Sequence, residues 1–299
     1  MTVFEHVGTA RDKLAEAGLA QRDAALDAEV LARHALGWDR TTYISSRHEA
    51  APTTFPAEYD ALVARRARRE PVSLITGHRE FWGLDFDVTS AVLTPRPETE
   101  LIIEEVLALL EEDVDPGSVL WRIVDVGTGS GCLAVALAHE LPISRVSATD
   151  VSEAALAVAK GNAAKHGVAD RVTFIRTSFL DGVGGIQNLV VANPPYVPTA
   201  ATKVLAPEIG AHEPRLALDG GPDGLDCIRT LLKQVATRLV GGGHLVLEFG
   251  LGQDDVVQEL VAGQDGLDLL RLRHDLQGIP RTAVIRRSDP KSWRLATGS

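Results

Sequence analysis

The chain has 299 residues, 45% hydrophobic and 24% charged, and its net charge at pH 7 is −11. This composition is ordinary for a packed globular protein and excludes a disordered one. The acidic balance argues against a general nucleic-acid binder, because the phosphate backbone favours a basic surface. The length suggests two domains.

Cysteine usage and hydropathy exclude further classes. Cys132 and Cys227 are too few for a disulfide framework, and no CxxC or His/Cys cluster indicates zinc, so we expect no metal. No apolar run approaches the roughly 18 residues that a membrane helix needs. The first residues lack the layout of a secretory signal. We therefore expect a cytoplasmic protein without membrane contact.

Residues 1–76 have the apolar spacing of about three short amphipathic helices. The first stripe, ending before Gly18, is Val3, Val7, Ala10 and Leu14. The second stripe, ending at Gly37, is Leu26, Val30, Leu31 and Ala35. Pro56 stands where the first turn of a third helix tolerates proline, ahead of Tyr59, Leu62 and Val63. These helices predict a small bundle.

A dense basic cluster closes this region. It consists of Arg65, Arg66, Arg68 and Arg69. Since charge runs are usually solvated surface, we interpret it as a solvated helix end with cations near the C-terminal carbonyls.

In the next segment the spacing of apolar residues changes from a helical period to alternation. Trp82, Leu84, Phe86 and Val88 alternate with polar residues and glycine, which predicts a strand. Thr89 and Ser90, with the apolar residues after them, suggest the hairpin that joins the two halves. A helix over 100–112 and a turn at 115–117 follow "TPRPETE".

From residue 119 onward, strands and helices alternate. We expect strands at 119–127, 145–150, 171–177, 188–193, 242–250, 267–276 and 282–287. Helical stretches lie between most of them, at 130–140, 152–166, 223–240 and 253–263. This alternation predicts a mainly parallel, doubly wound sheet. The connection "QGIPR" is too short for a parallel crossover, so one of the last two strands should be antiparallel.

A glycine loop follows the first strand of this sheet. The strand ends at Asp125 and runs into "GTGSG", residues 127–131, before a helix rich in alanine and leucine. Glycines let the backbone turn tightly and approach a ligand near the helix N-terminus. Asp150 ends the next strand, 21 residues after Gly129, where an acid would bind ribose hydroxyls. The pattern indicates a nucleoside cofactor of unspecified kind.

The strand at 188–193 ends in "NPPY", residues 193–196. Prolines stiffen this loop at the sheet edge where open α/β folds bind ligands. If the Asn193 side-chain oxygen and the Pro194 carbonyl accept both N–H bonds of a planar nitrogen, its lone pair is steered toward a methyl donor. Pro195 would keep the loop rigid, and Tyr196 would wall the flat substrate group. The motif therefore favours a nitrogen methyltransferase.

Seven stretches together resemble a known family: "PVSLITGHREFWGLDFDV", "VLTPRPETE", "DVGTGSGCLAVALA", "NPPYVP", "EPRLALDGGPDGLD", "GGHLVLEFGLGQ" and "QGIPR". They resemble the peptide chain release factor glutamine methyltransferases, which use S-adenosylmethionine to methylate the glutamine N5 of the Gly-Gly-Gln motif. "PRPETE" and "EPRLALDGGPDGLD" are the most particular of these stretches. The match spans nearly the whole chain.

The resemblance implies an α/β fold with a seven-stranded, doubly wound, Rossmann-like methyltransferase domain at 96–299. A helical bundle at 1–76 would help to dock the substrate, and a β-hairpin linker would occupy 77–95. Release factors would be the protein partners, with no direct nucleic-acid contact, and we expect a monomer.

The resemblance also implies site residues. The cofactor would contact Asp125, Gly127, Thr128, Gly129, Gly131, Asp150, Phe179 and Asn193. The substrate would contact Asn193, Pro194, Pro195, Tyr196, Arg96 and Glu98, with Asn193, Pro194 and Tyr196 as the catalytic group. The chain departs from the family at Ser178, where an acidic residue is frequent, so the contact to the adenine edge is open. "PRPETE" either borders the substrate entrance or forms an interdomain ion pair.

Other titratable residues receive structural interpretations. Glu208, His212 and Glu213 are not needed as bases, Cys132 is expected to pack in the core, and Glu248 is expected to be a structural strand-end acid. Two rival functions stay open. One is an N6-adenine methyltransferase acting on DNA or RNA, which would need base flipping and a basic surface. The other is a non-catalytic protein that docks on a translation factor.

Overall fold

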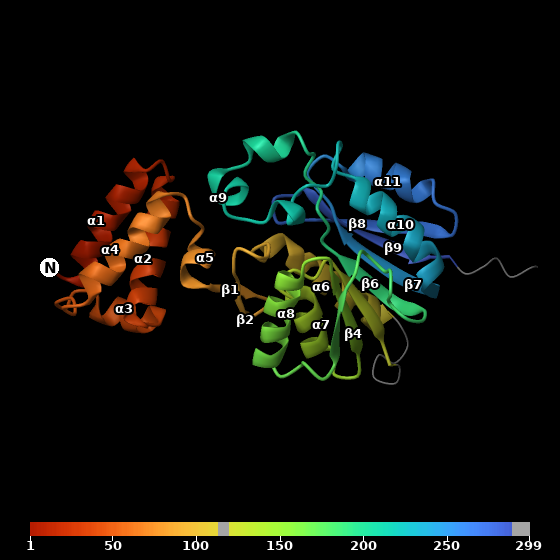
Figure 1. Cartoon of the computed structure of the whole chain (residues 1–299), viewed down its shortest axis with the longest axis horizontal. Coiled ribbons are helices and arrows are strands. Elements are labelled where there is room, and N and C mark those ends of the chain that lie inside the picture. Colours follow the sequence, from red (N-terminus) through yellow and green to blue (C-terminus); the bar gives the residue numbers. More distant parts are fainter. Residues whose placement is uncertain (113–119, 289–299) are drawn as a thin grey trace, which may run out of the picture. The chain divides into compact units, whose positions relative to one another are not determined.

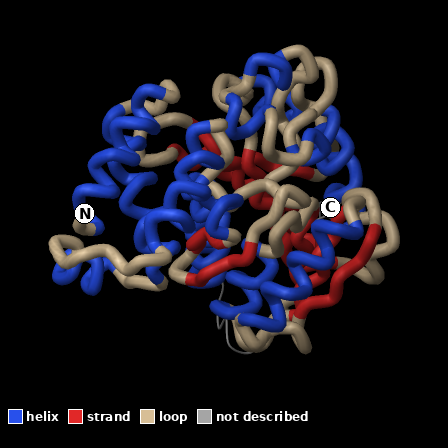
Figure 2. The backbone as a smooth tube through the Cα atoms, turned by 60° about the vertical axis from the view of Figure 1, so that its left-hand side comes forward, coloured by secondary structure: helices blue, strands red, loops and turns tan. Residues whose placement is uncertain are grey.

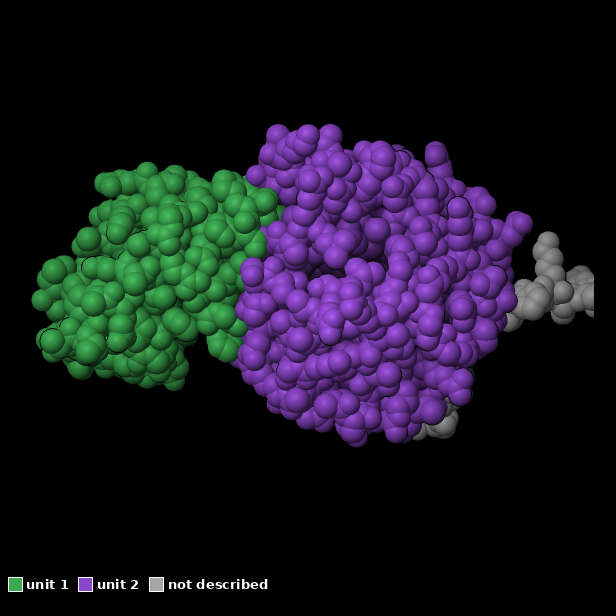
Figure 3. Space-filling view, viewed as in Figure 1, with its two compact units in different colours: residues 1–78, 206–212 green, residues 79–205, 213–299 purple. Residues whose placement is uncertain are grey.

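The computed structural model describes residues 1–112 and 120–288. The chain forms two compact units (Figure 3): unit 1 contains residues 1–78 and 206–212, and unit 2 contains residues 79–205 and 213–299. The expected turn at 115–117 and the C-terminal tail from Lys291 lie outside the described residues. Within the described part of the chain, no helix has the length and hydropathy of a membrane span.

Unit 1 is helical. Its helices are α1 (Val3–Glu16), α2 (Gln21–Leu36), α3 (Arg40–Ser46), α4 (Phe55–Ala67), α5 (Val72–Thr76) and the short α9 (Pro207–Gly210). The predicted first stripe is confirmed, since Val3, Ala10 and Leu14 are buried. Pro56 lies in the first turn of α4, as expected. Stacked Phe55 and Tyr59 fill the centre of the bundle.

The predicted stripe of α2 is wrong at one position. Leu26 is 59% exposed, whereas the buried face consists of Ala24, Ala28, Leu31 and Ala32. Helix α2 therefore packs largely through alanines, whose small side chains allow neighbouring helices to approach closely. A pattern search that favours large apolar residues selects an exposed leucine and overlooks buried alanines in such a helix.

The expected solvated helix end is confirmed for Arg68, which is exposed at the C-cap of α4, and is wrong for Arg66. Arg66 is only 7% exposed, and its guanidinium donates to Asp27 Oδ2 at 2.7 Å and to Glu208 Oε1 at 3.1 Å. Arg69 also donates to Glu208, at 3.0 Å, and Arg65 binds Glu70. Burial of a guanidinium requires such partners. These acids lie up to 142 positions away in sequence, so a local reading of the cluster missed them.

A two-stranded hairpin follows α5, with β1 (His78–Phe81) and β2 (Leu84–Asp87). Its turn is at Trp82 and Gly83, which both have positive φ, at 55° and 70°. The hairpin expected at Thr89 and Ser90 is wrong, because β1 and β2 are already joined at Trp82 and Gly83; the turn at 89–92, in which Val92 N donates to Thr89 O, follows β2. The hairpin turn is held by side chains: Gly83 N donates to Glu80 Oε1, and Trp82 N donates to Glu100 Oε1. The apolar alternation runs through the turn and conceals it.

Unit 2 contains the predicted seven-stranded sheet. Its strands are β3 (Arg122–Val126), β4 (Arg145–Asp150), β5 (Val172–Arg176), β6 (Gln187–Ala192), β7 (Leu239–Glu248), β8 (Leu267–His274) and β9 (Pro280–Arg287). The strand order is β5-β4-β3-β6-β7-β9-β8. Strand β9 is antiparallel to both of its neighbours, which confirms the prediction from the short connection.

Helices cover both faces of this sheet (Figures 1 and 2). They are α6 (Glu100–Glu112), α7 (Cys132–Glu140), α8 (Glu153–Lys165), α10 (Asp226–Arg238) and α11 (Asp254–Ala262). Adjacent strand residues enter opposite cores: Ile123 packs with α6 and α7, whereas Val124 packs with α10 and α11. This alternation is the pattern of a doubly wound sheet.

The parallel register brings the chemistry-bearing strand ends together. Val126 of β3 is paired with Thr149 of β4 on one side and with Ala192 of β6 on the other. The glycine loop, Asp150 and Asn193 therefore emerge at one edge of the sheet. This is the edge at which open α/β folds bind ligands.

Asn162 of α8 connects three segments of unit 2 and supports a stability prediction. It is buried, accepts from Asp87 N at 2.8 Å, and donates to Asp87 O and Ser130 O at 3.0 and 2.8 Å. The substitution Asn162→Ala removes these three hydrogen bonds. We expect it to lower the free energy of unfolding by about 2–4 kcal/mol in urea denaturation followed by circular dichroism.

Asn188→Ala is the matched control, because Asn188 Oδ1 accepts a single exposed bond, from Arg122 N. Its expected cost is below about 1 kcal/mol. Equal losses for the two variants would show that the buried bonds of Asn162 are not what stabilises this region.

Candidate active site

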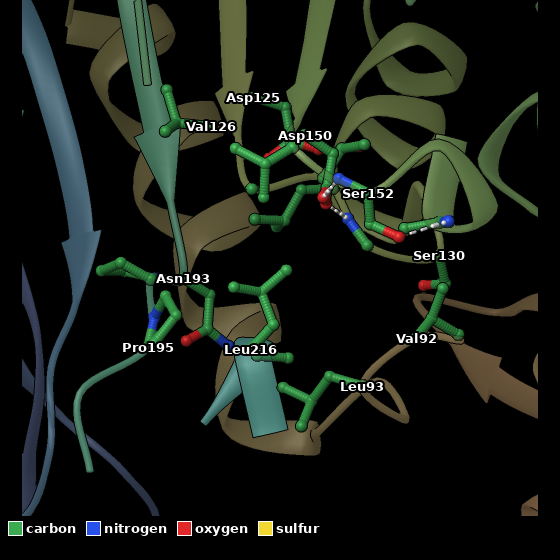
Figure 4. A pocket seen from close by; sticks show the side chains of 18 of the residues that line it. Val92, Leu93, Asp125, Val126, Ser130, Asp150, Ser152, Asn193, Pro195 and Leu216 are labelled. Carbon is green, nitrogen blue, oxygen red and sulfur yellow. Dashed lines mark hydrogen bonds between the residues drawn. The ribbon is translucent and has the colours of Figure 1, made fainter. Parts of the chain in front are cut away.

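A cavity of about 340 Å³ opens at the carboxyl edge of β3, β4 and β6 (Figure 4). Asp125 and Asp150 lie on one side of it, and Asn193, Pro195 and Leu216 lie on the other. The structure brings most of the sequence-predicted site residues to this cavity. They are Arg96, Asp125, Gly127, Thr128, Gly129, Asp150, Phe179, Asn193, Pro194 and Pro195.

Three predicted residues do not line this cavity. Gly131 is the N-cap residue of α7. Tyr196 and Glu98 line a second, smaller cavity of about 180 Å³, together with Arg96, Glu248 and Arg281. Arg96 is thus the one predicted residue that lines both cavities, and it binds the buried Glu213 at 2.6 Å.

The glycine loop has the backbone conformation that glycine permits. Gly129 and Gly131 have φ values of 54° and 83°. A Cβ on Gly131 would lie 3.0 Å from the Cβ of Ala159, so this position lets the loop pack against α8. Gly129 N donates to Asp150 Oδ2 at 3.0 Å, which ties the loop to the end of β4.

Asp125 is the most deeply buried acid of the cavity wall, at 1% exposure. Its Oδ2 accepts from Thr128 Oγ1 at 2.6 Å and from Ala134 N at 3.1 Å. Its Oδ1 has no partner among the described residues. Burial raises the pKa of Asp125 to about 7. A cationic group in the cavity would satisfy Oδ1 and favour the charged carboxylate.

The other wall residues suit a nucleoside. Asp150 accepts from Gly129 N and from Ser152 N, so the backbone fixes its carboxylate at the cavity. Phe179 has an unusual positive φ of 49° and is half-buried against the core. Ser178 also lines the cavity. A serine hydroxyl can both donate and accept, so it supplies polar contact where an acid would only accept.

The NPPY loop, Asn193–Tyr196, is held by a second segment, residues 218–224. Val197 N donates to Leu218 O and Gly220 N donates to Val197 O, each at 2.9 Å. A Cβ on Gly220 would lie 2.6 Å from Pro195 O, and one on Gly224 would collide with Tyr196 O. Only glycine fits at these two positions. The segment "DGGPDG" is therefore a support for the loop, a role that its sequence did not reveal.

Sequence reasoning missed two residues behind Asn193. Asn193 Nδ2 donates to Thr99 Oγ1 at 2.9 Å, and Thr99 Oγ1 donates to Glu248 Oε2 at 2.7 Å. Glu248 also accepts from Tyr196 Oη at 3.3 Å, and burial raises its pKa to about 7. The available signal was an acid within the apolar run "LVLEF", since a buried carboxylate needs partners.

The remaining titratable groups are not poised for catalysis. Burial raises the pKa of the Cys132 thiol to about 12, so the thiol stays protonated. Cys132 packs partly against the core, as expected, and it also lines the cavity. Burial raises the pKa of Tyr196, which keeps its phenol neutral. Glu213 binds Arg96, and Glu208 belongs to the ion pairs of unit 1.

Comparisons with known proteins agree with this geometry. Residues 7–77 match the PrmC N-terminal domain, and residues 107–222 match the methyltransferase small domain. The chain is 41% identical to the release factor glutamine methyltransferase of Bradyrhizobium diazoefficiens, over 90% of both chains. It is 44% identical to that of Moorella thermoacetica, over 87% of this chain and 89% of the relative.

The chain belongs to the release factor glutamine methyltransferase family. Solved structures at lower identity share its fold. A methyltransferase from Pyrococcus furiosus has a TM-score of 0.52 at 17% identity, covering 76% of this chain and 99% of that one. The hMettl16 catalytic domain has a TM-score of 0.54 at 20% identity, covering 76% and 81%. The seven-stranded methyltransferase fold predicted from the sequence is thus confirmed.

The buried carboxylate of Asp125 gives this family member a pH-dependent stability. Its pKa of about 7 in the folded chain exceeds the ordinary pKa of an aspartate, 3.8, so the unfolded chain binds fewer protons between these values. The Asp125 contribution to stability should therefore fall as the pH rises from about 4 to 7, and level off above 7.

Asp125→Asn removes this charge and keeps an oxygen for Thr128 and Ala134. We expect its gain in unfolding free energy over the wild type to grow across that interval, by an amount of the order of a few kcal/mol. Urea denaturation at several pH values measures it. Asp265→Asn, at an exposed site, should show no such growth. A pH-independent difference for Asp125→Asn would contradict the assignment.

Proposed function

We propose that this protein transfers a methyl group from S-adenosylmethionine to the side-chain N5 of the glutamine in the Gly-Gly-Gln motif of peptide chain release factors. The observation that carries the proposal is the NPPY loop, whose Asn193 and Pro194 line the cavity in a chain of this family. We also propose a cytoplasmic monomer that acts on protein without direct nucleic-acid contact, in keeping with its acidic charge.

The cofactor fits the residues of the cavity. S-adenosylmethionine supplies a methyl group on a positively charged sulfur. In the proposal, Asp150 binds the ribose hydroxyls, Phe179 lies near the adenine, and Gly127–Gly131 lies along the methionine portion. The unpartnered Oδ1 of Asp125 supports this arrangement, because a methionine portion carries a cationic ammonium.

Asn193 and Pro194 would act on the substrate by positioning. An amide nitrogen is a poor nucleophile because its lone pair is delocalised. With both N–H groups bound to Asn193 Oδ1 and Pro194 O, the lone pair is directed at the methyl carbon. The nitrogen lone pair would then form the new C–N bond while the C–S bond breaks with its electron pair left on sulfur, and the nitrogen would release one proton to water. No strong base is required before transfer.

Three proposed roles complete the assignment. Residues 1–76 would help to dock the release factor, 77–95 would link the domains, and 96–299 would carry catalysis. Tyr196 as a wall for the substrate amide stays a prediction, since Tyr196 lines the second cavity. Arg96 and Glu98 remain candidates for the substrate entrance.

Asn193→Ala tests the proposed chemistry. We expect the rate of glutamine methylation to fall by at least about 100-fold, because a transition-state hydrogen bond is lost. Calorimetry should show that the affinity for S-adenosylmethionine changes by less than about threefold, below 1 kcal/mol. Mass spectrometry of the release factor, which locates the methyl group, is the assay.

Asn188→Ala is the control and should keep wild-type activity, because Asn188 lies outside the cavity lining. Retained activity in Asn193→Ala would overturn the proposed grip on the amide. A wild-type protein that methylates nucleic acid and leaves the release factor unmodified would overturn the proposed substrate.

The docking role of unit 1 has its own test. Leu26 and Ile44 are exposed apolar residues of this unit, 59% and 56% accessible. If they contact the release factor, Leu26→Glu with Ile44→Glu should raise the KM for the intact protein by about 10-fold, with little change in kcat. The KM for a short peptide carrying Gly-Gly-Gln should not change.

Ile143→Glu is the control, because Ile143 is exposed at the amino end of β4, the edge opposite to the cavity. A rise in KM for both the peptide and the intact release factor would show that the Leu26 and Ile44 substitutions disturb the active site. No rise for either substrate would remove these two residues from the docking surface.

A further inference from the structure

Asn193 does not stand alone at the cavity wall. A chain of hydrogen bonds runs from Asn193 Nδ2 through Thr99 Oγ1 to Glu248 Oε2, with distances of 2.9 and 2.7 Å. Thr99 and Glu248 are each 2% exposed. The two residues come from the segment before α6 and from the end of β7, so three distant parts of the chain meet at this amide.

The donor capacity of each group fixes the direction of the chain. An ionised carboxylate can only accept hydrogen bonds, so the single O–H of Thr99 must donate its hydrogen bond to Glu248. The Thr99 oxygen can then only accept. The side chain of Asn193 therefore presents its NH₂ group to Thr99, because its oxygen would find no donor there.

Neighbouring groups shift the pKa of Glu248 in opposite directions. Burial raises its pKa to about 7, while Thr99 and Tyr196 lower it by donating hydrogen bonds to it. Glu98 raises it and Arg281 lowers it. At pH 8, above this pKa, the carboxylate is mostly ionised and accepts the hydrogen bond from Thr99.

We propose that Thr99 and Glu248 are positioning residues that lock the Asn193 amide with its nitrogen turned to Thr99 and its oxygen left to accept from the substrate. The structure records no hydrogen bond to Asn193 Oδ1 within residues 1–112 and 120–288. This inference rests on the proposed function, in which Oδ1 binds an N–H of the glutamine side chain.

The lock has a consequence for specificity. A site that presents two fixed acceptors, Asn193 Oδ1 and Pro194 O, binds a primary amide through its two N–H groups. It disfavours a carboxylate, because the carboxylate oxygens can only accept and would lie against the two acceptor oxygens of the site. An unlocked Asn193 could rotate its NH₂ toward the substrate and would lose this discrimination.

Thr99→Val against Thr99→Ser tests the proposal at pH 8. Valine keeps the volume and removes the hydroxyl, so kcat for release factor methylation should fall by about 10- to 100-fold, as expected for loss of one or two hydrogen bonds. Serine keeps the hydroxyl and should retain kcat within about threefold. The affinity for S-adenosylmethionine, measured by calorimetry, should be unchanged in both variants.

A double-mutant cycle separates positioning from packing. In the Asn193→Ala background, Thr99→Val should cost nothing further, because Thr99 acts only through Asn193. Glu248→Met removes the acceptor at similar volume and should lower kcat as Thr99→Val does. The double variant Thr99→Val with Glu248→Met should be no worse than either single variant. Single-turnover mass spectrometry resolves these slow rates, and thermal denaturation confirms that each variant is folded.

Three outcomes would overturn the inference while the proposed function stands: wild-type kcat in Thr99→Val, equal losses in Thr99→Val and Thr99→Ser, or a full additional loss in the Asn193→Ala background. Wild-type protein that fails to methylate the glutamine would instead refute the proposed function. The two failures are therefore distinguishable from the wild-type arm alone.

Discussion

Asp125 and Glu248 lie at the carboxyl ends of β3 and β7, the two strands that flank β6, and both carboxylates are nearly sealed from water. Burial raises the pKa of each to about 7, so holding the charged forms there costs stability. Each carboxylate accepts a hydrogen bond from a threonine hydroxyl: Asp125 from Thr128 at 2.6 Å and Glu248 from Thr99 at 2.7 Å. The two acids thus orient groups on opposite sides of the cavity.

Rigidity of the NPPY loop depends on backbone contacts as much as on its prolines. Gly220 and Gly224 bring the segment 218–224 against the carbonyls of Pro195 and Tyr196, where no Cβ fits. Gln253 donates to Tyr196 O at 3.0 Å from a third direction. The Asn193 acceptor can position the substrate amide only if its loop does not move when the substrate binds. A displacement of about 1 Å can lower a reaction rate by a large factor.

The spacing of apolar residues and the positions of glycine and proline were sufficient to predict the seven strands, an antiparallel strand among the last two, and the loops at the sheet edge. These features follow from local alternation and from turn chemistry. Features that depend on distant partners were not predictable. The turn at Trp82 is fixed by the acid of Glu100, the burial of Arg66 by Asp27 and Glu208, and the role of Glu248 by Thr99.

The site residues also divide into those that local sequence could place and those that depend on distant partners. Asp125, Asp150 and Asn193 could be placed at one cavity because parallel strands share an edge, and their chemical roles remain proposals. Thr99 lies within "PRPETE", whose charged residues Arg96 and Glu98 were chosen as site candidates, whereas the threonine was not. A hydroxyl becomes informative only when its donor and acceptor partners are known.

Segment Ala206–His212 belongs to unit 1, although the residues on both sides of it belong to unit 2. Its anchor is Glu208, which binds Arg66 and Arg69. Removing residues 1–75 would delete both arginines and leave Glu208 without these partners. It would also release the stretch that connects Leu205 to Glu213, the residue that binds Arg96 at the cavity. A truncated enzyme would therefore lose the proposed docking unit and these ion pairs together. Single exposed residues such as Leu26 and Ile44 separate the two effects, because their side chains take no part in these ion pairs.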